Sequence, residues 1–384
     1  MRTLDVYLED VEPRHDSGRY IINVRLSRSY DEDLRLWYSI PFEQWEYCSF
    51  DLMDSFLIAA LLKAMEDGAA LRIHGPVSSS LLDNLEEFQV IFSLWFPDKY
   101  SRIDIRAQSE SEEKKVNDLV ILSFSGGVDG TFCALNHVMR RGPIKRKLFD
   151  VDAILYVEGF DVNIDYDREC KNVVERNKRL FEGNNDLKFL NVRTNLKYLL
   201  STKRFWTSHA CVLVSVASLF RKICGGVLVG SSHSYIHLLP WGSHPLTDRL
   251  LSSKGFEVHH DMVFTRVEKL KALLAWPEAL ENLKVCWEGQ YKFETPPDIN
   301  CCVCDKCVRT MLAFRALGQE VPSSFPGELT TDKVRSLKDK PFDWSRLMFL
   351  HEVLDAAKEN GKDKDPLFAT LAEIIDGHEL KRKS

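Results

Sequence analysis

The stretch DLVILSFSGGVDGTFCAL, Asp118–Leu135, decides the fold because it joins an apolar run, a glycine turn and the start of a helix. The run Asp118–Phe124 is too short for a helix and lies between charged residues and glycines, which is typical of a buried parallel strand. The composition of Thr131–Met139 favours a helix. Gly126 and Gly127 let the backbone approach an anion closely, and the positive end of the helix dipole lies at the same place. The turn therefore predicts a phosphate-binding site.

After this turn the chain alternates short apolar runs with longer helical segments. The apolar runs predict strands at Asp152–Glu158, Leu187–Val192 and Gly226–Val229. The longer segments predict helices at Tyr166–Phe181 and Ser208–Cys224. Such alternation is typical of parallel strands joined by crossover helices. We expect an α/β fold with a doubly wound parallel sheet, whose ligand lies at the carboxyl ends of the strands. The pocket would be lined by the loops that follow the strands, Gly159–Asp161, Arg193–Asn195 and Ser231–His233.

The first part of the chain has a different pattern. Short β-rich runs at Thr3–Leu8, Tyr20–Leu26 and Leu34–Ile40 predict an antiparallel meander. Helical spacing follows in two segments, and two further runs are strand candidates; in chain order these are Phe50–Met65, Ala70–His74, Ser78–Phe96 and Tyr100–Ala107. Residues 109–118 carry almost no apolar side chain, which predicts a domain boundary. Residues 1–112 are therefore expected to form a small α+β accessory domain.

The composition is that of a globular enzyme. The 384 residues are 45% hydrophobic and 28% charged, and their number suggests two domains or one large domain with an appendage. The net charge of −6 argues against a dominant nucleic-acid surface, and the basic Lys145–Lys147 is more simply a solvated loop. No apolar run has the length of a membrane span or the form of a signal peptide. We expect a cytoplasmic protein without a membrane partner.

Four of the ten cysteines have the spacing of metal ligands. Cys301, Cys304 and Cys307 form a C-x-x-C-x-x-C motif, and Cys286, at the end of an expected short strand Leu283–Cys286, can complete a tetrahedral site. Four thiolates leave no open position, so the site is structural and holds the helix expected to start near Asp305. Zn²⁺ is the expected metal; an iron–sulfur cluster is the alternative.

The segment Leu239–Ser253 packs polar residues among glycine and proline, a composition that often carries function in loops. We expect Ser243, His244, Asp248 and Arg249 to lie in the site. His244 also has a simpler interpretation, as a hydrogen-bonded loop histidine without a chemical role.

The glycine turn resembles the SGGxDS pyrophosphate loop of the PP-loop ATPases, which split ATP between its α and β phosphates. The residues that match are Ser125, Gly126, Gly127, Val128 and Asp129. The family then has a serine, where this chain has Gly130 followed by Thr131, whose hydroxyl can replace the missing one. The spacing fits neither a Walker A loop nor a dinucleotide fingerprint. An ordinary strand–turn–helix with two glycines is the alternative.

The loop, the sheet and the late cysteines together resemble the 7-cyano-7-deazaguanine synthase (QueC) family over residues 117–320. The family's zinc cysteines match the four named above, although the interval between the first two is longer here. Residues 1–112 are an addition to the family's usual chain, and residues 321–384 are an extension with helical patterns at Arg346–Lys358 and Leu367–Ile375. The chain thus looks like a divergent QueC-like protein of the kind found in bacterial anti-phage clusters such as CBASS and Qat.

This resemblance implies ATP-dependent activation of a carboxylate like that of 7-carboxy-7-deazaguanine, with release of pyrophosphate, and then amide formation. Mg²⁺ would neutralise the phosphates, with Asp129 nearby. In Phe264–Leu273 a capping box already explains Thr265 and Glu268, but the resemblance places Arg266 and Lys269 at the phosphates. The residues with implied catalytic roles are Asp129, Ser125, Thr131, His244 and Arg266. The implied nucleotide-binding residues are Ser125 to Thr131, Gly230, Ser231, Ser232 and Lys269.

Several alternatives remain open at this point. The amine is either ammonia, with a further dehydration to a nitrile, or another acceptor, such as the N-terminus of a protein partner docked on the aromatic-rich residues 1–112. A PP-loop RNA-modifying enzyme with a sulfur-transferring cysteine is a different class, against which the acidic charge and the metal-like cysteine spacing argue. A degenerate nucleotide-binding module is a third class. The oligomeric state is open, with a homodimer as one alternative.

Overall fold

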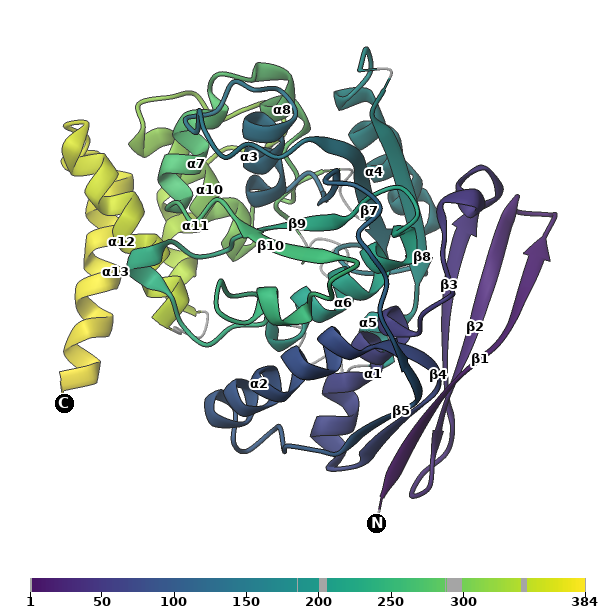
Figure 1. The fold of residues 1–384 in the computed structure, drawn as a ribbon. Coiled ribbons are helices and arrows are strands. Elements are labelled where there is room, and N and C mark those ends of the chain that lie inside the picture. Colours follow the sequence, from purple (N-terminus) through teal and green to yellow (C-terminus); the bar gives the residue numbers. More distant parts are fainter. Residues whose placement is uncertain are drawn as a thin grey trace.

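The fold comes from a computed structural model that describes residues 2–184, 186–199, 206–286, 288, 299–339 and 344–383. Its centre is one ten-stranded, mostly parallel sheet with the order β10-β9-β6-β7-β8-β3-β2-β1-β4-β5 (Figure 1). The strands are β1 (Thr3–Arg14), β2 (Arg19–Arg28), β3 (Leu34–Pro41), β4 (Ala70–Ser78), β5 (Ile105–Ser111), β6 (Val120–Ser123), β7 (Val151–Glu158), β8 (Lys188–Thr194), β9 (Gly226–Gly230) and β10 (Glu257–Asp261).

Strands β6 to β10 form one parallel part of the sheet, in which β6 lies between β7 and β9. A second parallel part consists of β1, β4 and β5. The chain continues from β6 to β7 and β8 on one side, and then reaches β9 and β10 on the other. The order therefore reverses between β6 and β9, and such a reversal opens a crevice at the carboxyl ends of the strands. At this edge of the sheet the glycine turn after β6 and the loop after β9 lie close together, because Lys269 bonds to both Asp129 and Ser231.

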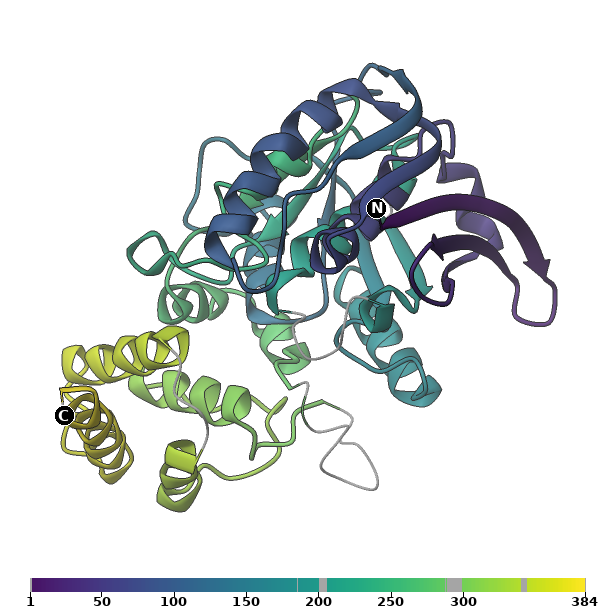
Figure 2. The ribbon, with the colours of Figure 1, turned by 90° about the horizontal axis from the view of Figure 1, so that it is seen from below.

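The predicted meander is confirmed, because β1, β2 and β3 pair in antiparallel order. The structure joins this meander to the parallel strands through antiparallel pairing of Tyr38 and Ser39 in β3 with Thr194 and Arg193 in β8. The ribbon of β1 and β2 and the C-terminal helices lie at opposite ends of the molecule (Figures 1 and 2). The boundary expected near residue 112 stays a prediction, within a sheet that is continuous across it.

Helices cover both faces of the sheet. They are α1 (Asp54–Asp67), α2 (Ser79–Trp95), α3 (Val128–His137), α4 (Asp167–Leu180), α5 (Leu196–Leu199), α6 (His209–Ala217), α7 (Arg266–Leu273), α8 (Pro277–Asn282), α10 (Asp305–Ala316), α11 (Thr331–Arg335), α12 (Trp344–Glu359) and α13 (Pro366–Lys383). Single 3-10 turns are η1 (Phe42–Tyr47), η3 (Ser218–Phe220), η4 (Tyr235–His237), η5 (Asp248–Leu251) and η6 (Ser336–Asp339). Among the described residues no helix is both long enough and apolar enough to cross a membrane.

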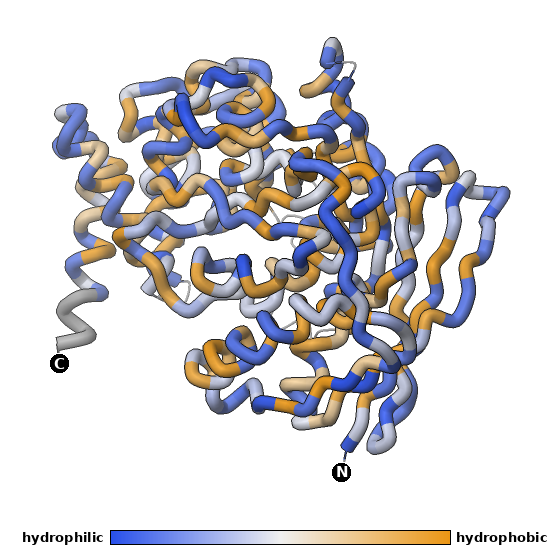
Figure 3. Tube along the Cα trace, in the orientation of Figure 1, coloured by the Kyte–Doolittle hydropathy of each residue, from blue (hydrophilic) through white to orange (hydrophobic). Residues whose placement is uncertain are grey.

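Alternate side chains of β6 pack into two different hydrophobic cores, one on each face of the sheet. Ile121 of β6 packs into the core that contains α1 and α6, whereas Val120 and Leu122 pack into the core that contains α3, α7, α10 and α12. Figure 3 shows the apolar residues in orange along the strands and at intervals along the helices. The first core includes residues from both sides of position 112, such as Phe56 and Val212.

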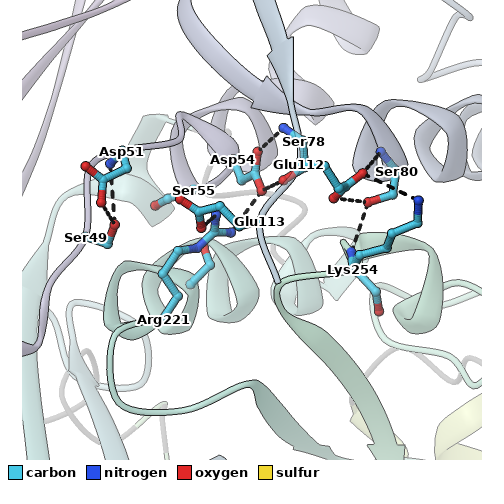
Figure 4. A network of polar contacts seen from close by, with 12 residues as sticks. Ser49, Asp51, Asp54, Ser55, Ser78, Ser80, Glu112, Glu113, Arg221 and Lys254 are labelled. Atoms are coloured by element: carbon cyan, nitrogen blue, oxygen red, sulfur yellow. Dashed lines mark hydrogen bonds and ion pairs between the residues drawn. The ribbon is translucent and has the colours of Figure 1, made fainter. Parts of the chain in front are cut away.

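A polar network also links the two parts of the chain (Figure 4). Asp54 at the start of α1 accepts hydrogen bonds from Ser78 and pairs with Arg221 at 2.9 Å, with both charged side chains buried. Glu113 also contacts Arg221, at 3.3 Å, and Glu112 binds the α2 start at Ser80. The charged residues 109–118 thus serve as an edge strand and as part of this network.

Two sequence-based assignments of elements need correction, and one strand was not predicted. The expected strand Leu283–Cys286 is wrong: the N–H groups of Val285 and Cys286 both donate to Oδ1 of Asn300 and not to a neighbouring strand. A single helix was expected at Ser208–Cys224, but the α-helix ends at Ala217 and a 3-10 turn follows at Ser218–Phe220. Strand β10 was not predicted, because EVHHD is a polar edge strand without an apolar run.

Candidate functional site

The glycine turn has the geometry that an anion site needs. Gly126 has a φ of 78°, the left-handed region that glycine adopts without strain, and Gly127 is the extended residue before α3. A Cβ on Gly126 would lie 3.0 Å from Oδ1 of Asn177, so a side chain there would also be crowded. The first N–H groups of α3 thus lie just after β6, at the edge of the sheet where the strand order reverses.

Two further glycines let α3 lie close to the strands. A Cβ on Gly130 would lie 3.2 Å from the carbonyl oxygen of Ser123 at the end of β6. A Cβ on Gly230 at the end of β9 would lie 3.1 Å from the carbonyl carbon of Asp129. The close packing of α3 on β6 is a physical reason for glycine at position 130, where the PP-loop pattern has serine. The hydroxyl of Thr131 donates to the Gly127 carbonyl at 2.7 Å, within the helix.

Asp129 is held between two cations that α7 supplies. Its Oδ1 accepts a hydrogen bond from Nζ of Lys269 at 2.7 Å, and its Oδ2 lies 3.2 Å from Nη2 of Arg266. The Lys269 side chain is 1% exposed and also donates to the carbonyl oxygen of Ser231 in the loop after β9. The structure therefore brings together four of the sequence-predicted site residues, from three separate segments.

The charges of this group determine its protonation state. Burial acts to raise the pKa of Asp129, but the positive charges of Arg266 and Lys269 outweigh that effect and lower it. Asp129 is therefore a carboxylate at neutral pH. Lys306 near the start of α10 adds positive charge to the same region. Desolvation by the surrounding protein lowers the pKa of Lys306.

Helix α7 begins with the predicted capping box. The hydroxyl of Thr265 accepts the N–H of Glu268, and the Glu268 carboxylate accepts the N–H of Thr265. The Arg266 N–H donates to Oε2 of Glu352 at 2.9 Å, and Oε1 of Glu352 lies 3.0 Å from Nδ1 of His237. A residue of the C-terminal helix α12 thus fixes the first turn of the helix that carries Arg266 and Lys269.

Helix α12 also supplies an aromatic wall. The ring of Phe349 lies 5.4 Å from the guanidinium of Arg266 and 4.9 Å from that of Arg309, distances typical of cation–π contacts. Sequence reasoning did not find Phe349 or Glu352. Both lie in an ordinary amphipathic helix about 80 residues from α7, and no local pattern distinguishes them.

The other predicted loop residues lie in a separate network. Asp248 is buried and accepts hydrogen bonds from Oγ of Ser243 at 2.6 Å and from the N–H of His244 at 2.9 Å. The His244 ring packs against Trp95 at 5.0 Å between centroids, and Arg249 pairs with Glu87 at the surface. The described contacts of His244 are those of a structural loop residue. Ser125 lies in the turn after β6 and Ser232 in the loop after β9.

The four cysteines form a cluster that could bind a metal such as zinc. The Sγ atoms of Cys286, Cys301, Cys304 and Cys307 lie within 4.8 Å of one another. Two of the pairs are 3.8 and 3.9 Å apart. Four sulfurs around one tetrahedral Zn²⁺, with bonds of about 2.3 Å, lie about 3.8 Å apart, so the spacing fits a single ion. Hydrogen bonds from the other three thiols lower the pKa of Cys286, which favours the thiolate that a metal requires.

The cysteine cluster is connected to the Asp129 group through α10. Cys304 is the residue before α10, and Lys306 and Arg309 lie in the first two turns of this helix. A metal at the cluster would therefore fix the helix that directs these two cations towards Asp129 and Phe349. The predicted structural role of the cysteines is compatible with this arrangement, and the loop between Cys286 and Cys301 lies mostly outside the described residues.

Comparisons of the chain with protein-family models, with curated proteins and with solved structures find no match. The chemical interpretation therefore depends on the site itself.

Proposed function

We propose that the chain is an ATP-dependent carbon–nitrogen ligase of the QueC-like kind, which activates a carboxylate and forms AMP and pyrophosphate. The observation that carries this proposal is the Asp129–Lys269–Arg266 group directly after the Gly126 turn. A helix N-terminus and two fixed cations beside it suit a triphosphate, whose charge grows on the leaving pyrophosphate during the reaction.

Each part of the group has a role in this proposal. The first N–H groups of α3 hold the phosphates, and Arg266 and Lys269 stabilise the charge on the leaving pyrophosphate. Mg²⁺ is a hard cation that prefers carboxylate oxygens, so Asp129 is the residue that would hold it or its waters, and the ion would neutralise phosphate charge. Zn²⁺ at the four cysteines has a structural role, because four thiolates leave no position for substrate.

The reaction proceeds in two steps, adenylation of the carboxylate and transfer of the acyl group to an amine. An oxygen of the carboxylate attacks the α-phosphorus of ATP, and pyrophosphate leaves. An amine then attacks the acyl carbon, the bond to AMP breaks, and the proton of the amine is lost as the amide forms. The carboxylate is of the 7-carboxy-7-deazaguanine type. The amine is that of a protein partner, for example its N-terminus, in a bacterial antiviral defence system; ammonia, followed by dehydration to the nitrile, is the alternative.

The test is the formation of AMP and pyrophosphate from ATP with and without the carboxylated deazaguanine. We expect AMP and pyrophosphate in equal amounts, dependent on the carboxylate, and their loss in Asp129→Ala. Asp118→Ala is the matched control, because Asp118 is an exposed aspartate eleven positions earlier that pairs with Lys115. Release of ADP and phosphate, or equal turnover in both variants, would contradict the proposal.

One observation supports a second candidate function. The Thr131 hydroxyl, expected to stand in for the serine hydroxyl of the PP-loop pattern, donates its hydrogen to the Gly127 carbonyl inside α3. A protein that binds a nucleotide without turnover, as an interaction module, would have this feature. Tight ATP binding without AMP formation in the assay above would favour that function.

A further inference from the structure

His233 is a buried imidazole in the loop after β9. Its side-chain environment is aromatic: the ring lies parallel to Phe349, with 5.6 Å between centroids and 9° between planes, and edge-on to Trp241 at 5.1 Å. The residue is 4% exposed. The hydroxyl of Ser231 donates to the His233 carbonyl at 2.5 Å, which fixes the backbone. The loop and the two rings thus hold this imidazole in one orientation.

The polar atoms of this ring have no partner in the described structure. Neither Nδ1 nor Nε2 has a hydrogen bond among the described residues. Burial, followed by the charge of Arg266, lowers the pKa of His233 to about 4, so the ring is neutral at pH 7, with one donor and one acceptor nitrogen. Buried polar groups are nearly always bonded, and an unsatisfied donor costs about 1–3 kcal/mol. A ligand that bonds this ring would remove that cost.

His233 belongs to the same site as Asp129. Phe349, on which the ring lies, also contacts the guanidinium of Arg266. Two residues before His233, the Ser231 carbonyl accepts the hydrogen bond of Lys269, which pairs with Asp129. The charges of Arg266, Asp129 and Lys269 all act on the imidazole. One aromatic ring and one short loop therefore connect His233 to both cations of the Asp129 group.

We infer that His233 is a ligand-binding residue whose N–H group donates a hydrogen bond to an oxyanion oxygen of the bound substrate. A neutral imidazole is suited to this role beside Arg266 and Lys269, because it supplies a donor without adding a third positive charge. The oxygen belongs either to the α-phosphate of the nucleotide or to the carboxylate. The choice between these two sources rests on the proposed function, whereas the hydrogen bond itself does not.

The experiment measures binding of two probes, AMP and the carboxylated 7-deazaguanine, each alone, by calorimetry with the full-length protein. His233→Phe keeps a flat ring against Phe349 and removes both nitrogens, and His233→Asn keeps a donor. His74→Phe is the matched control, since His74 also lies parallel to an aromatic ring, that of Tyr7 at 4.0 Å, but is in β4. Thermal unfolding shows that each variant is folded.

We expect one probe to bind His233→Phe about tenfold more weakly or worse, and His233→Asn within a few-fold of the wild type, because a hydrogen bond to a charged group contributes about 1.5–3 kcal/mol. The probe that loses affinity identifies the source of the oxygen. Equal affinity of both probes for His233→Phe and wild type, an equal loss in His74→Phe, or no binding of either probe to wild type at millimolar concentration would overturn the inference. His233-dependent binding without AMP formation from ATP would sustain the inference and contradict the proposed function alone.

Discussion

Asp129 is the residue on which the electrostatics of the site depend, because it is the counter-charge of the buried Lys269. Asp129→Asn should lower the free energy of unfolding at pH 7 by about 3 kcal/mol, the lower end of the range for a broken buried pair, since the Asp129 side chain is 22% exposed. The measurement is denaturant unfolding of both proteins at several pH values.

The stabilisation by the Asp129 carboxylate depends on pH. The pKa of Asp129 is lowered in the folded protein, whereas in the unfolded chain it is about 3.9. The carboxylate therefore stabilises the fold above that unfolded value, and the contribution is lost as the pH falls through the native pKa. The difference between wild type and Asp129→Asn should be full at neutral pH and shrink in acid below about pH 4. A difference that does not change with pH would contradict the pairing.

The cysteine cluster gives a second prediction for single residues. Cys304→Ser should lose the bound metal, about one Zn²⁺ per chain, and unfold more easily, because metal-binding free energy contributes to folding. Cys302→Ser is the control: Cys302 is buried beside the cluster, but its Sγ accepts the N–H of Gly327 and is not a member of the cluster. The measurement is elemental analysis of the metal content per chain in the wild type and in both variants. Iron with sulfide, or a wild-type protein without metal, would contradict the zinc assignment.

Among single residues, the sequence predicts those whose role depends on neighbours that are close along the chain. The turn at Gly126, the C-x-x-C-x-x-C motif and the pair Arg266 and Lys269 one helical turn apart all have short-range signatures. His233 was predicted only as part of a pocket loop. Its neighbour Phe349 comes from more than 100 residues later, and contacts at that separation depend on tertiary packing, which no motif records.

Among the elements, helix α12 contributes more to the site than its position in a C-terminal extension suggests. Glu352→Ala should remove the acceptor for the Arg266 N–H and for His237, and so lower the free energy of unfolding by about 1–3 kcal/mol. Hydrogen exchange should increase at the first turn of α7. Glu359→Ala, at the exposed end of the same helix, is the control. Equal stability and equal exchange in the two variants would show that α12 does not support α7.

The elements differ in how well their sequences predict them. The α7 start was predicted and confirmed because a capping box is a local bond pattern. The strand expected at Leu283–Cys286 was wrong because Asn300, beyond the intervening loop, satisfies its backbone. Leu283 and Cys286 are nevertheless buried and Val285 is partly buried, so burial was predictable where the hydrogen-bond partner was not.

For the whole molecule, the buried pair of Asp54 and Arg221 tests how strongly the two parts of the chain depend on each other (Figure 4). Asp54→Ala leaves the Arg221 charge buried, apart from its contact with Glu113, and should cost about 3–5 kcal/mol of unfolding free energy. The control Glu9→Ala breaks the solvent-screened surface pair with Arg25 and should cost far less. Similar costs for both variants would contradict a structural coupling between the parts.

The α/β class of the molecule was predictable, because alternating strands and helices have their own periodicities. The ten-stranded sheet was not, since the pairing of β3 with β8 joins residues about 155 positions apart, and the sequence carries no signal for it. The polar residues 109–118 have the composition of a linker. In the folded chain they contribute to an exposed edge strand and to an ion-pair network, two structures that have the same polar composition.

The central claim is that the Asp129 site joins a carboxylate to the α-phosphate of ATP. The most direct test uses carboxylated 7-deazaguanine labelled with oxygen-18 in its carboxylate, together with ATP and an amine, followed by mass spectrometry of the AMP. Attack of the carboxylate on the α-phosphorus predicts AMP that carries one oxygen-18 atom and an amide that keeps the other. Unlabelled AMP, or ADP in place of AMP, would show that water or another group attacks ATP, and would contradict the claim.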